Sequence, residues 1–143
     1  MKPSAWAAVA LGLLITVPVT ARAQQNPAGA VDLVQLGRNY PNPFNPETTI
    51  PFTLNEALWA GGQDPVVSLR IYNILAQLVA VPILQGSGEP LDNMRLAWNG
   101  TGNYTAYWDG KVLNTGREAA SGVYIYQIVV NGNAVSKKMT IVK

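Results

Sequence analysis

The residues able to carry out chemistry are few in this sequence. It contains no histidine and no cysteine, so it lacks the usual general base, the thiol nucleophile and the commonest zinc ligands. Ser87 and Ser121 therefore have no histidine to activate them for nucleophilic attack. Asp109 is a lone carboxylate, with no second acid near it in the sequence for acid–base catalysis or a calcium loop. The sequence predicts a protein that is not an enzyme and that has no metal site and no cofactor.

The triplet Trp108-Asp109-Gly110 has a simpler structural explanation. A carboxylate directly before a glycine is typical of a turn, where its oxygens accept backbone N–H bonds. We expect Asp109 to cap this turn while Trp108 packs in the core.

The first 23 residues predict a secretory signal peptide. Lys2 precedes an apolar run over residues 7–19, and Ala21-Arg22-Ala23 has the small–x–small pattern of a cleavage site. Cleavage is expected between Ala23 and Gln24. A membrane anchor is the alternative, but the run is too short to cross about 30 Å of hydrocarbon. We therefore expect an exported chain with no integral membrane span after signal removal.

Charge and the lack of cysteine narrow the partners of the mature chain. Cleavage removes two of the ten basic residues, Lys2 and Arg22, and none of the eight acidic residues, so the mature chain is formally neutral. A neutral domain is poorly suited to an electrostatic nucleic-acid partner. Without cysteine the chain has no disulfide and no site for lipid attachment, so its core alone must hold an exported fold together.

Residues 39–54 organise the rest of the chain. Three prolines in the first half fix their own φ angles and bias the preceding residues towards extended geometry, which excludes a helix. In the second half Ile50, Phe52 and Leu54 occupy every second position, the pattern of a strand with one buried face. Pro51 cannot donate to a strand ladder, so we expect this strand at the edge or start of a sheet. The proline-rich half contains Tyr40, Pro41, Asn42, Pro43, Phe44, Asn45 and Pro46.

The remaining chain has the pattern of short strands separated by turns. Asn131-Gly132 is the strongest hairpin signal, and Pro82 again suggests an edge strand. The pattern predicts an all-β, antiparallel immunoglobulin-like β-sandwich of seven to eight strands, with a closed barrel as the alternative. Strands are expected over residues 66–72, 78–84, 94–98, 104–108, 122–130 and 134–142, with another short one over 31–36 and a helical turn over 56–60.

The same alternation predicts the core. Tyr124 stands near the start of the penultimate strand, where its hydroxyl could bond to nearby backbone as a tyrosine corner does. Lys137 shares the inward side of the last strand and must reach out at its rim. Six side chains are expected to be largely buried between the sheets: Phe52, Leu69, Ile71, Trp108, Tyr124 and Ile141.

Residues 39–143 also carry a family resemblance. The run from Tyr40 to Pro46, followed by Thr-x-Ile-x-Phe, resembles the opening of the C-terminal sorting domains of type IX (Por) secretion. It is also similar to the immunoglobulin-like domain of the flagellar hook-capping protein family. Four further matches follow in family order: Ile-Tyr-Asn-Ile-Leu-Ala-Gln at 71–77, Trp-Asp-Gly at 108–110, Ser-Gly-Val-Tyr at 121–124 and Lys-Met-Thr-Ile-Val-Lys at 138–143. Ala76 replaces the usual glycine, and residues 85–103 form a longer stretch than in the family.

This resemblance implies an organisation and a function. Together with the signal peptide over residues 1–23, it implies a linker over 24–38 and a sorting-type β-sandwich over 39–143. Such domains are recognised in the periplasm by outer-membrane export machinery, so the expected partner is a protein. The expected location is the periplasm, the cell surface or the medium. The residues that match the family's recognition motifs are Gly122, Tyr124, Lys138 and Lys143.

A second function remains open at this point. Sorting domains normally follow a large cargo, whereas only residues 24–38 separate the predicted cleavage site from this domain. The alternative is a stand-alone extracellular immunoglobulin-like module, such as an adhesion or filament subunit. A hook-capping role is less favoured, because the N-terminal portion that this family uses on the flagellum is missing.

The signal peptide is tested by the N-terminus of the exported protein. We expect N-terminal sequencing of protein recovered after export to begin at Gln24. Changing both Ala21 and Ala23 to Leu should block cleavage, because signal peptidase requires small residues there. A mature protein that retains residues 1–23 would contradict the assignment to the exported class.

Overall fold

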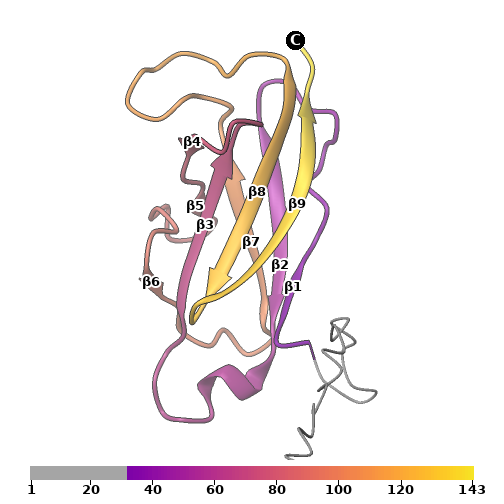
Figure 1. Cartoon of the computed structure of the whole chain (residues 1–143). Coiled ribbons are helices and arrows are strands. Elements are labelled where there is room, and N and C mark those ends of the chain that lie inside the picture. The colour runs from indigo at the N-terminus through magenta and orange to yellow at the C-terminus, as the bar shows by residue number, and fades with distance from the viewer. Residues whose placement is uncertain (1–31) are drawn as a thin grey trace, which may run out of the picture. The chain divides into compact units, whose positions relative to one another are not determined.

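The computed structural model describes residues 32–143, which are almost entirely β (Figure 1). The strands are β1 (Val34–Leu36), β2 (Thr48–Leu54), β3 (Val66–Tyr72), β4 (Leu78–Ala80), β5 (Ile83–Leu84), β6 (Met94–Arg95), β7 (Asn103–Trp108), β8 (Gly122–Val130) and β9 (Asn133–Ile141). They form two antiparallel sheets, one in the order β1-β2-β7-β5 and the other in the order β4-β3-β8-β9, with β6 paired to β3. The predicted signal peptide, its cleavage site and residues 24–31 lie outside the described part of the chain.

The two sheets enclose one hydrophobic core, so the domain is a β-sandwich. In β2, and in β8 from Tyr124 onwards, every second side chain is buried and those between are half-exposed. Such alternation is the sequence signature of a sheet with one face turned to the core. The six side chains predicted to be buried are all at most 8% exposed, which confirms this interpretation: Phe52, Leu69, Ile71, Trp108, Tyr124 and Ile141.

The short elements before β3 also match their predictions. β1 lies within the range predicted for a first short strand and pairs with the end of β2. The helical turn is a 3-10 helix, η1 (Glu56–Trp59), which begins where the Asn55 side chain accepts a 2.9 Å hydrogen bond from the Ala57 N–H. At its end, the indole N–H of Trp59 donates to the carbonyl of Leu96 at 2.9 Å, which fixes this turn to the chain that follows β6.

One predicted strand is two strands in different sheets. The sequence predicts a single strand over residues 78–84, but β4 pairs with β3 in one sheet and β5 pairs with β7 in the other. The chain crosses between the sheets at Val81 and Pro82, where the proline has no N–H to offer either ladder. The described residues therefore form nine strands rather than the predicted seven to eight.

Pro51 lies inside a sheet, which corrects the prediction that it marks an edge or a start. Strand β2 runs between β1 and β7. The carbonyl of Pro51 accepts a 2.8 Å hydrogen bond from the Gly37 N–H, just beyond the end of β1. Both polar backbone groups of a residue in an antiparallel strand point to the same side. The ring nitrogen of Pro51 therefore also faces the β1 side, and the ladder to β7 loses no donor.

A tyrosine hydroxyl joins the two sheets in the middle of the molecule. Tyr126 on β8 is fully buried, and its hydroxyl donates to the Gly37 carbonyl at 2.8 Å while accepting from the Asn39 N–H at 3.2 Å. Both partners follow β1 of the opposite sheet. Burial raises the pKa of Tyr126 above its ordinary value, so the hydroxyl remains protonated and can donate.

The packing of the core gives a testable prediction. Replacing Ile71, which is 0% exposed, by Ala should lower the free energy of unfolding by about 2–5 kcal/mol through lost transfer energy and a cavity. Ile74 lies three residues later in an exposed turn and is 73% exposed. Ile74→Ala is therefore a matched control that should change stability by less than about 0.5 kcal/mol. Equal losses in urea denaturation would show that the burial of β3 has been misinterpreted.

Candidate functional site

The four predicted recognition residues lie on the last two strands and just beyond them. In the β8–β9 ladder, Gly122 is opposite Ile141, and Lys138 is opposite Ile125. Lys143 follows the end of β9, and the chain ends on the same side of the sandwich as the loop before β8 (Figure 1). The structure therefore gathers all four positions on one hairpin, although their side chains have different surroundings.

Tyr124 has a structural role. Its side chain is 8% exposed, and its ring meets Trp108 edge-on at 6.0 Å between centroids. Its hydroxyl donates to the carbonyl of Ala120 at 2.8 Å, which is the backbone bond predicted for a tyrosine near the start of this strand. Burial raises its pKa. Tyr124 thus closes the loop before β8 and offers little surface to a partner.

Gly122 is exposed, and glycine is favoured at this position by the backbone conformation rather than by a neighbouring atom. Its φ angle is 151°, in a region that residues with a side chain seldom adopt, and a Cβ atom added there would meet no atom within 4 Å. The glycine therefore allows the backbone conformation at the start of β8, and no close contact requires it, because the space around it is open.

Lys138 lies on the outer face of its sheet at the end of an apolar row. The register places Leu78 opposite Tyr72, Tyr72 opposite Ile125 and Ile125 opposite Lys138, and residues directly opposite share a face. Leu78 is 45% exposed, and the Lys138 side chain is also exposed. No carboxylate of the described residues lies within 4.0 Å of its ammonium group. This row ending in Lys138 is called the outer row below.

Lys143 is tied to the loop before β8. Its backbone N–H donates to the Ser121 hydroxyl at 3.1 Å, and its ammonium group lies 3.6 Å from a carboxylate oxygen of Glu118. Both side chains of this ion pair are about half exposed, so the pair contributes little to stability. Sequence reasoning did not find Ser121 and Glu118 as partners, because nothing in the local pattern brings residues 118–121 to the end of the chain.

The proline-rich segment is the unexpected neighbour of the terminal strand. Phe44 pairs with Ile141 in parallel. The Phe44 N–H donates to the Thr140 carbonyl and the Val142 N–H donates to the Phe44 carbonyl, both at 3.1 Å. The Asn42 side chain accepts from the Thr140 N–H at 3.1 Å. The first and last motifs of the resemblance, which lie about 100 residues apart in the sequence, are therefore hydrogen-bonded to each other in the fold.

The triplet Trp108-Asp109-Gly110 forms a turn that packs against the proline-rich segment at Pro46. The Asp109 carboxylate accepts from the Lys111 N–H at 2.9 Å, and the Trp108 indole N–H donates to the Lys111 carbonyl at 3.0 Å. The Asp109 bond confirms the predicted turn cap, and the 3% exposure of Trp108 confirms that it packs in the core. Gly110 has a φ angle of 81°, and a Cβ atom there would lie 1.8 Å from the carbonyl oxygen of Pro46. Only glycine allows the two backbones to approach so closely.

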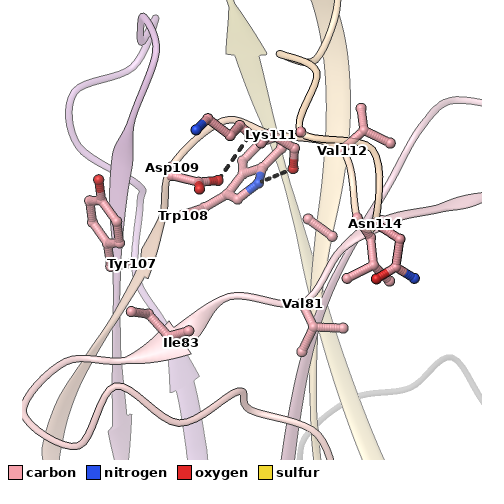
Figure 2. Close-up of a pocket in the computed structure, with 11 residues that line it drawn as sticks. Val81, Ile83, Tyr107, Trp108, Asp109, Lys111, Val112 and Asn114 are labelled. Atoms are coloured by element: carbon pink, nitrogen blue, oxygen red, sulfur yellow. Dashed lines mark hydrogen bonds between the residues drawn. The ribbon is translucent and has the colours of Figure 1, made fainter.

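A cavity of about 320 Å³ opens beside this turn (Figure 2). It lies where the chain crosses from β4 to β5, against the end of β7 and the loop that follows. Its aliphatic lining includes Val81, Ile83 and Val112, and its polar lining includes Asp109 and Asn114. The cavity combines two segments far apart in the sequence, residues 80–83 and 107–116, so no local pattern could have identified it.

Within residues 32–143 no group of three or more His, Cys, Asp or Glu side chains is placed to hold a metal ion. In that same part of the chain no helix is long and apolar enough to cross a membrane.

Comparison with known proteins gives only a weak structural likeness. No protein-family model matches the chain, and no curated protein matches it. Among solved structures, the alkylpurine DNA glycosylase AlkC of Pseudomonas fluorescens, bound to DNA containing an abasic site analogue, is similar with a TM-score of 0.47 and 15% sequence identity. The likeness covers 81% of this chain but only 32% of that protein. A likeness at this level carries no argument about function.

The contact between Gly110 and Pro46 gives a prediction with an internal control. Gly110→Ala should lower the free energy of unfolding by roughly 3 kcal/mol or more, because it adds a clash to the strain of a positive φ angle. Gly116 also has a positive φ angle, but a Cβ atom there would meet nothing within 4 Å. Gly116→Ala should therefore cost only about 1–2 kcal/mol. Equal costs in urea denaturation would contradict the close approach.

Proposed function

We propose that this chain is a non-enzymatic exported β-sandwich of the type IX C-terminal sorting class, recognised through its terminal strand by protein export machinery of the outer membrane. The observation that carries the proposal is the arrangement of Lys138 and Lys143. Both lysines are exposed on the terminal segment, and neither contributes to the core. An exposed cation that the core does not need is a natural contact for a protein partner.

The neighbours of Lys138 support recognition of a folded surface. The outer row gives a partner a half-buried apolar strip of Tyr72 and Ile125 that ends in the cation. Apolar contact area supplies affinity, while a charge at the end of the strip fixes register and orientation. The partner expected from this chemistry is a protein with an apolar contact and an acidic group placed to meet Lys138.

The strand order supports the immunoglobulin-like form of the sandwich. If β1, β2, β3, β5, β7, β8 and β9 are named A to G in chain order, one sheet has the order A-B-E-D, and the other has the order C-F-G with β4 and the short β6 added beside C. Apart from these two added strands, that is the arrangement of a constant-type immunoglobulin domain. The bond from the Tyr124 hydroxyl to Ala120, near the start of strand F, is consistent with the tyrosine corner of such domains.

A stand-alone surface or filament module is the second candidate, and one observation favours it. Strand β9 is the last in its sheet, and the proline-rich segment covers only its end, at residues 140–142. The earlier part of β9 is therefore an edge that another extended strand could join. Lys138 on such an edge would then serve to discourage uncontrolled pairing.

Export of a fused reporter separates the two functions. Residues 31–143, which include β1 and form one compact unit, are fused to the end of a periplasmic reporter in a bacterium with type IX machinery. Under the sorting proposal the reporter should reach the surface or medium, and Lys138→Ala should reduce this fraction several-fold. Lys137→Ala is the matched control, because Lys137 is the adjacent lysine on the inward face of the same strand.

Stability must be measured alongside export. Deleting residues 139–143 would be a poor test, since Met139 and Ile141 are at most 3% exposed and their loss would unfold the domain. Point variants with unchanged thermal unfolding avoid this problem. If the folded, stable fusion stays in the periplasm, the sorting proposal is wrong and the module is favoured. If Lys138→Ala and Lys137→Ala reduce the exported fraction equally, the outer row is not the surface that the export machinery recognises.

A further inference from the structure

Strand β9 has an outer edge whose backbone groups are unpaired over most of its length. Thr140 points its N–H and C=O away from β8, since both are bonded to the proline-rich segment. Residues two apart in an antiparallel strand point these groups the same way. The backbone groups of Ala134, Ser136 and Lys138 therefore also face outward, and none of them has a partner among residues 32–143. The edge thus offers alternating N–H donors and C=O acceptors in a row.

The proline-rich segment already uses this edge in the way that a partner strand would. It pairs with β9 in parallel at Ile141, and its bonds from Asn42 and Phe44 reach Thr140 and Val142. The cover ends there, while β9 continues along the outside of its sheet down to the hairpin turn (Figure 1). A strand added beside the open part would therefore extend a ladder that the chain itself has begun.

The charged residues along this side of the sandwich are all basic. Residues 33–46, which include β1 and the proline-rich segment, contain Arg38 and no other charged residue. Residues 121–142, which include β8 and β9, contain Lys137 and Lys138 and no other charged residue. Strand β2, the neighbour of β1, is uncharged. No carboxylate of residues 32–143 lies within 4.0 Å of any of the three cations. The segments that form this edge therefore carry positive charge without an acid to offset it.

Tyr126 brings two of these cations together. Lys137 is directly opposite Tyr126 in the β8–β9 ladder, so their side chains share the inward side of the sheet. The Tyr126 hydroxyl bonds to Gly37 and Asn39, the two neighbours of Arg38 in the chain. Burial raises the pKa of Tyr126, and the positive charge of Arg38 opposes this rise. Arg38 and Lys137 therefore lie near the same tyrosine, on the inward side of the β9 edge.

We propose that the β9 edge binds an extended segment of a protein partner by strand addition, and that this segment carries acidic side chains. Backbone hydrogen bonds to Ala134, Ser136 and Lys138 would supply affinity, and a carboxylate opposite Lys137 would supply specificity. A second copy of this chain is a poor occupant, because pairing of two β9 strands would bring the same lysines together. A phosphate or a nucleic-acid backbone is also a poor occupant, because it has no donors for the row of carbonyl acceptors.

The inference deepens the second candidate function, because it names the kind of strand that the open edge would accept. It does not depend on export, since Arg38 and Lys137 are not part of the outer row. The measurements below use purified protein, so their failure would leave the result of the reporter assay unchanged. Failure of export would equally leave the binding result unchanged.

Blocked heptapeptides test the charge preference on the chain that begins at Gln24. The peptides alternate threonine or valine with a variable residue, so that the variable side chains share one face of an extended strand. The variable residue is glutamate, glutamine or lysine. We expect the glutamate peptide to bind with a dissociation constant in the millimolar range. The glutamine peptide should bind about two- to five-fold more weakly, as for loss of opposite-charge cross-strand pairs, and the lysine peptide should not bind.

Amide hydrogen exchange by NMR shows whether the peptide adds as a strand. The outward N–H groups of Ala134, Ser136 and Lys138 should exchange roughly ten-fold more slowly at a glutamate-peptide concentration ten times the dissociation constant. The N–H groups of Val135 and Lys137 point towards β8. Their exchange should not change, so they are an internal control within the same strand.

Substitutions separate the backbone contribution from the charge. Ser136→Pro removes the central outward donor without removing a bond to β8, and should abolish binding. Ser136→Ala keeps the N–H and is the matched control, with unchanged binding expected. Lys137→Gln and Arg38→Gln should each weaken the glutamate peptide about two- to five-fold and leave the glutamine peptide unaffected. Lys111→Gln alters an exposed lysine in the loop after β7 and should have no effect.

Three outcomes would overturn the proposal. The first is equal binding of the three peptides, which would show that the cations do not select the strand. The second is binding without slower exchange at Ala134, Ser136 and Lys138, which would place the peptide elsewhere. The third is a dimer in sedimentation equilibrium with these N–H groups already protected, which would make a second copy the occupant. If Ser136→Pro fails to fold, the exchange pattern and Lys137→Gln still decide the question.

Discussion

Phe44 joins the beginning of the sandwich to its end. Its two backbone hydrogen bonds reach Thr140 and Val142, and its ring, which is 2% exposed, meets Trp108 edge-on at 5.6 Å between centroids. Two residues later the chain passes over Gly110 with no room for a side chain between them. The terminal strand, the turn after β7 and the rim of the cavity are therefore all positioned by one short segment rich in proline. A segment with few accessible backbone conformations is well suited to this role.

The local features of this fold could be predicted from the sequence. The period of two in β2 and β8 places Phe52 and Tyr124 in the core because strand geometry alone decides which face a side chain joins. The Asp109 cap and the bond from the Tyr124 hydroxyl to Ala120 each join residues two to four positions apart. Such contacts depend on residue type and short spacing, which a single sequence displays directly.

Features that depend on tertiary pairing could not be predicted in the same way. Val79, Val81 and Ile83 alternate as a single strand would, yet the chain changes sheets at Pro82. Pro51 lacks a backbone N–H, which suggests that its strand lies at the edge of a sheet. Only the bond from Gly37 to the Pro51 carbonyl shows on which side the missing donor falls, and hence why β2 can lie inside the sheet. Proline chemistry indicates that a ladder is interrupted, but it does not say on which side. The cavity and the outer row have the same origin, since each is assembled from strands that sequence spacing does not connect.

The parallel direction of the join at Phe44 has a mechanical consequence. If the chain were pulled at β1 and at Lys143, the proline-rich segment and the end of β9 would be drawn past each other lengthwise. The hydrogen bonds that Thr140 and Val142 make with Asn42 and Phe44 would then carry the load together, in shear, rather than open one at a time as a zipper does. Tension along the chain would thus meet its resistance at this patch before the core strands began to separate.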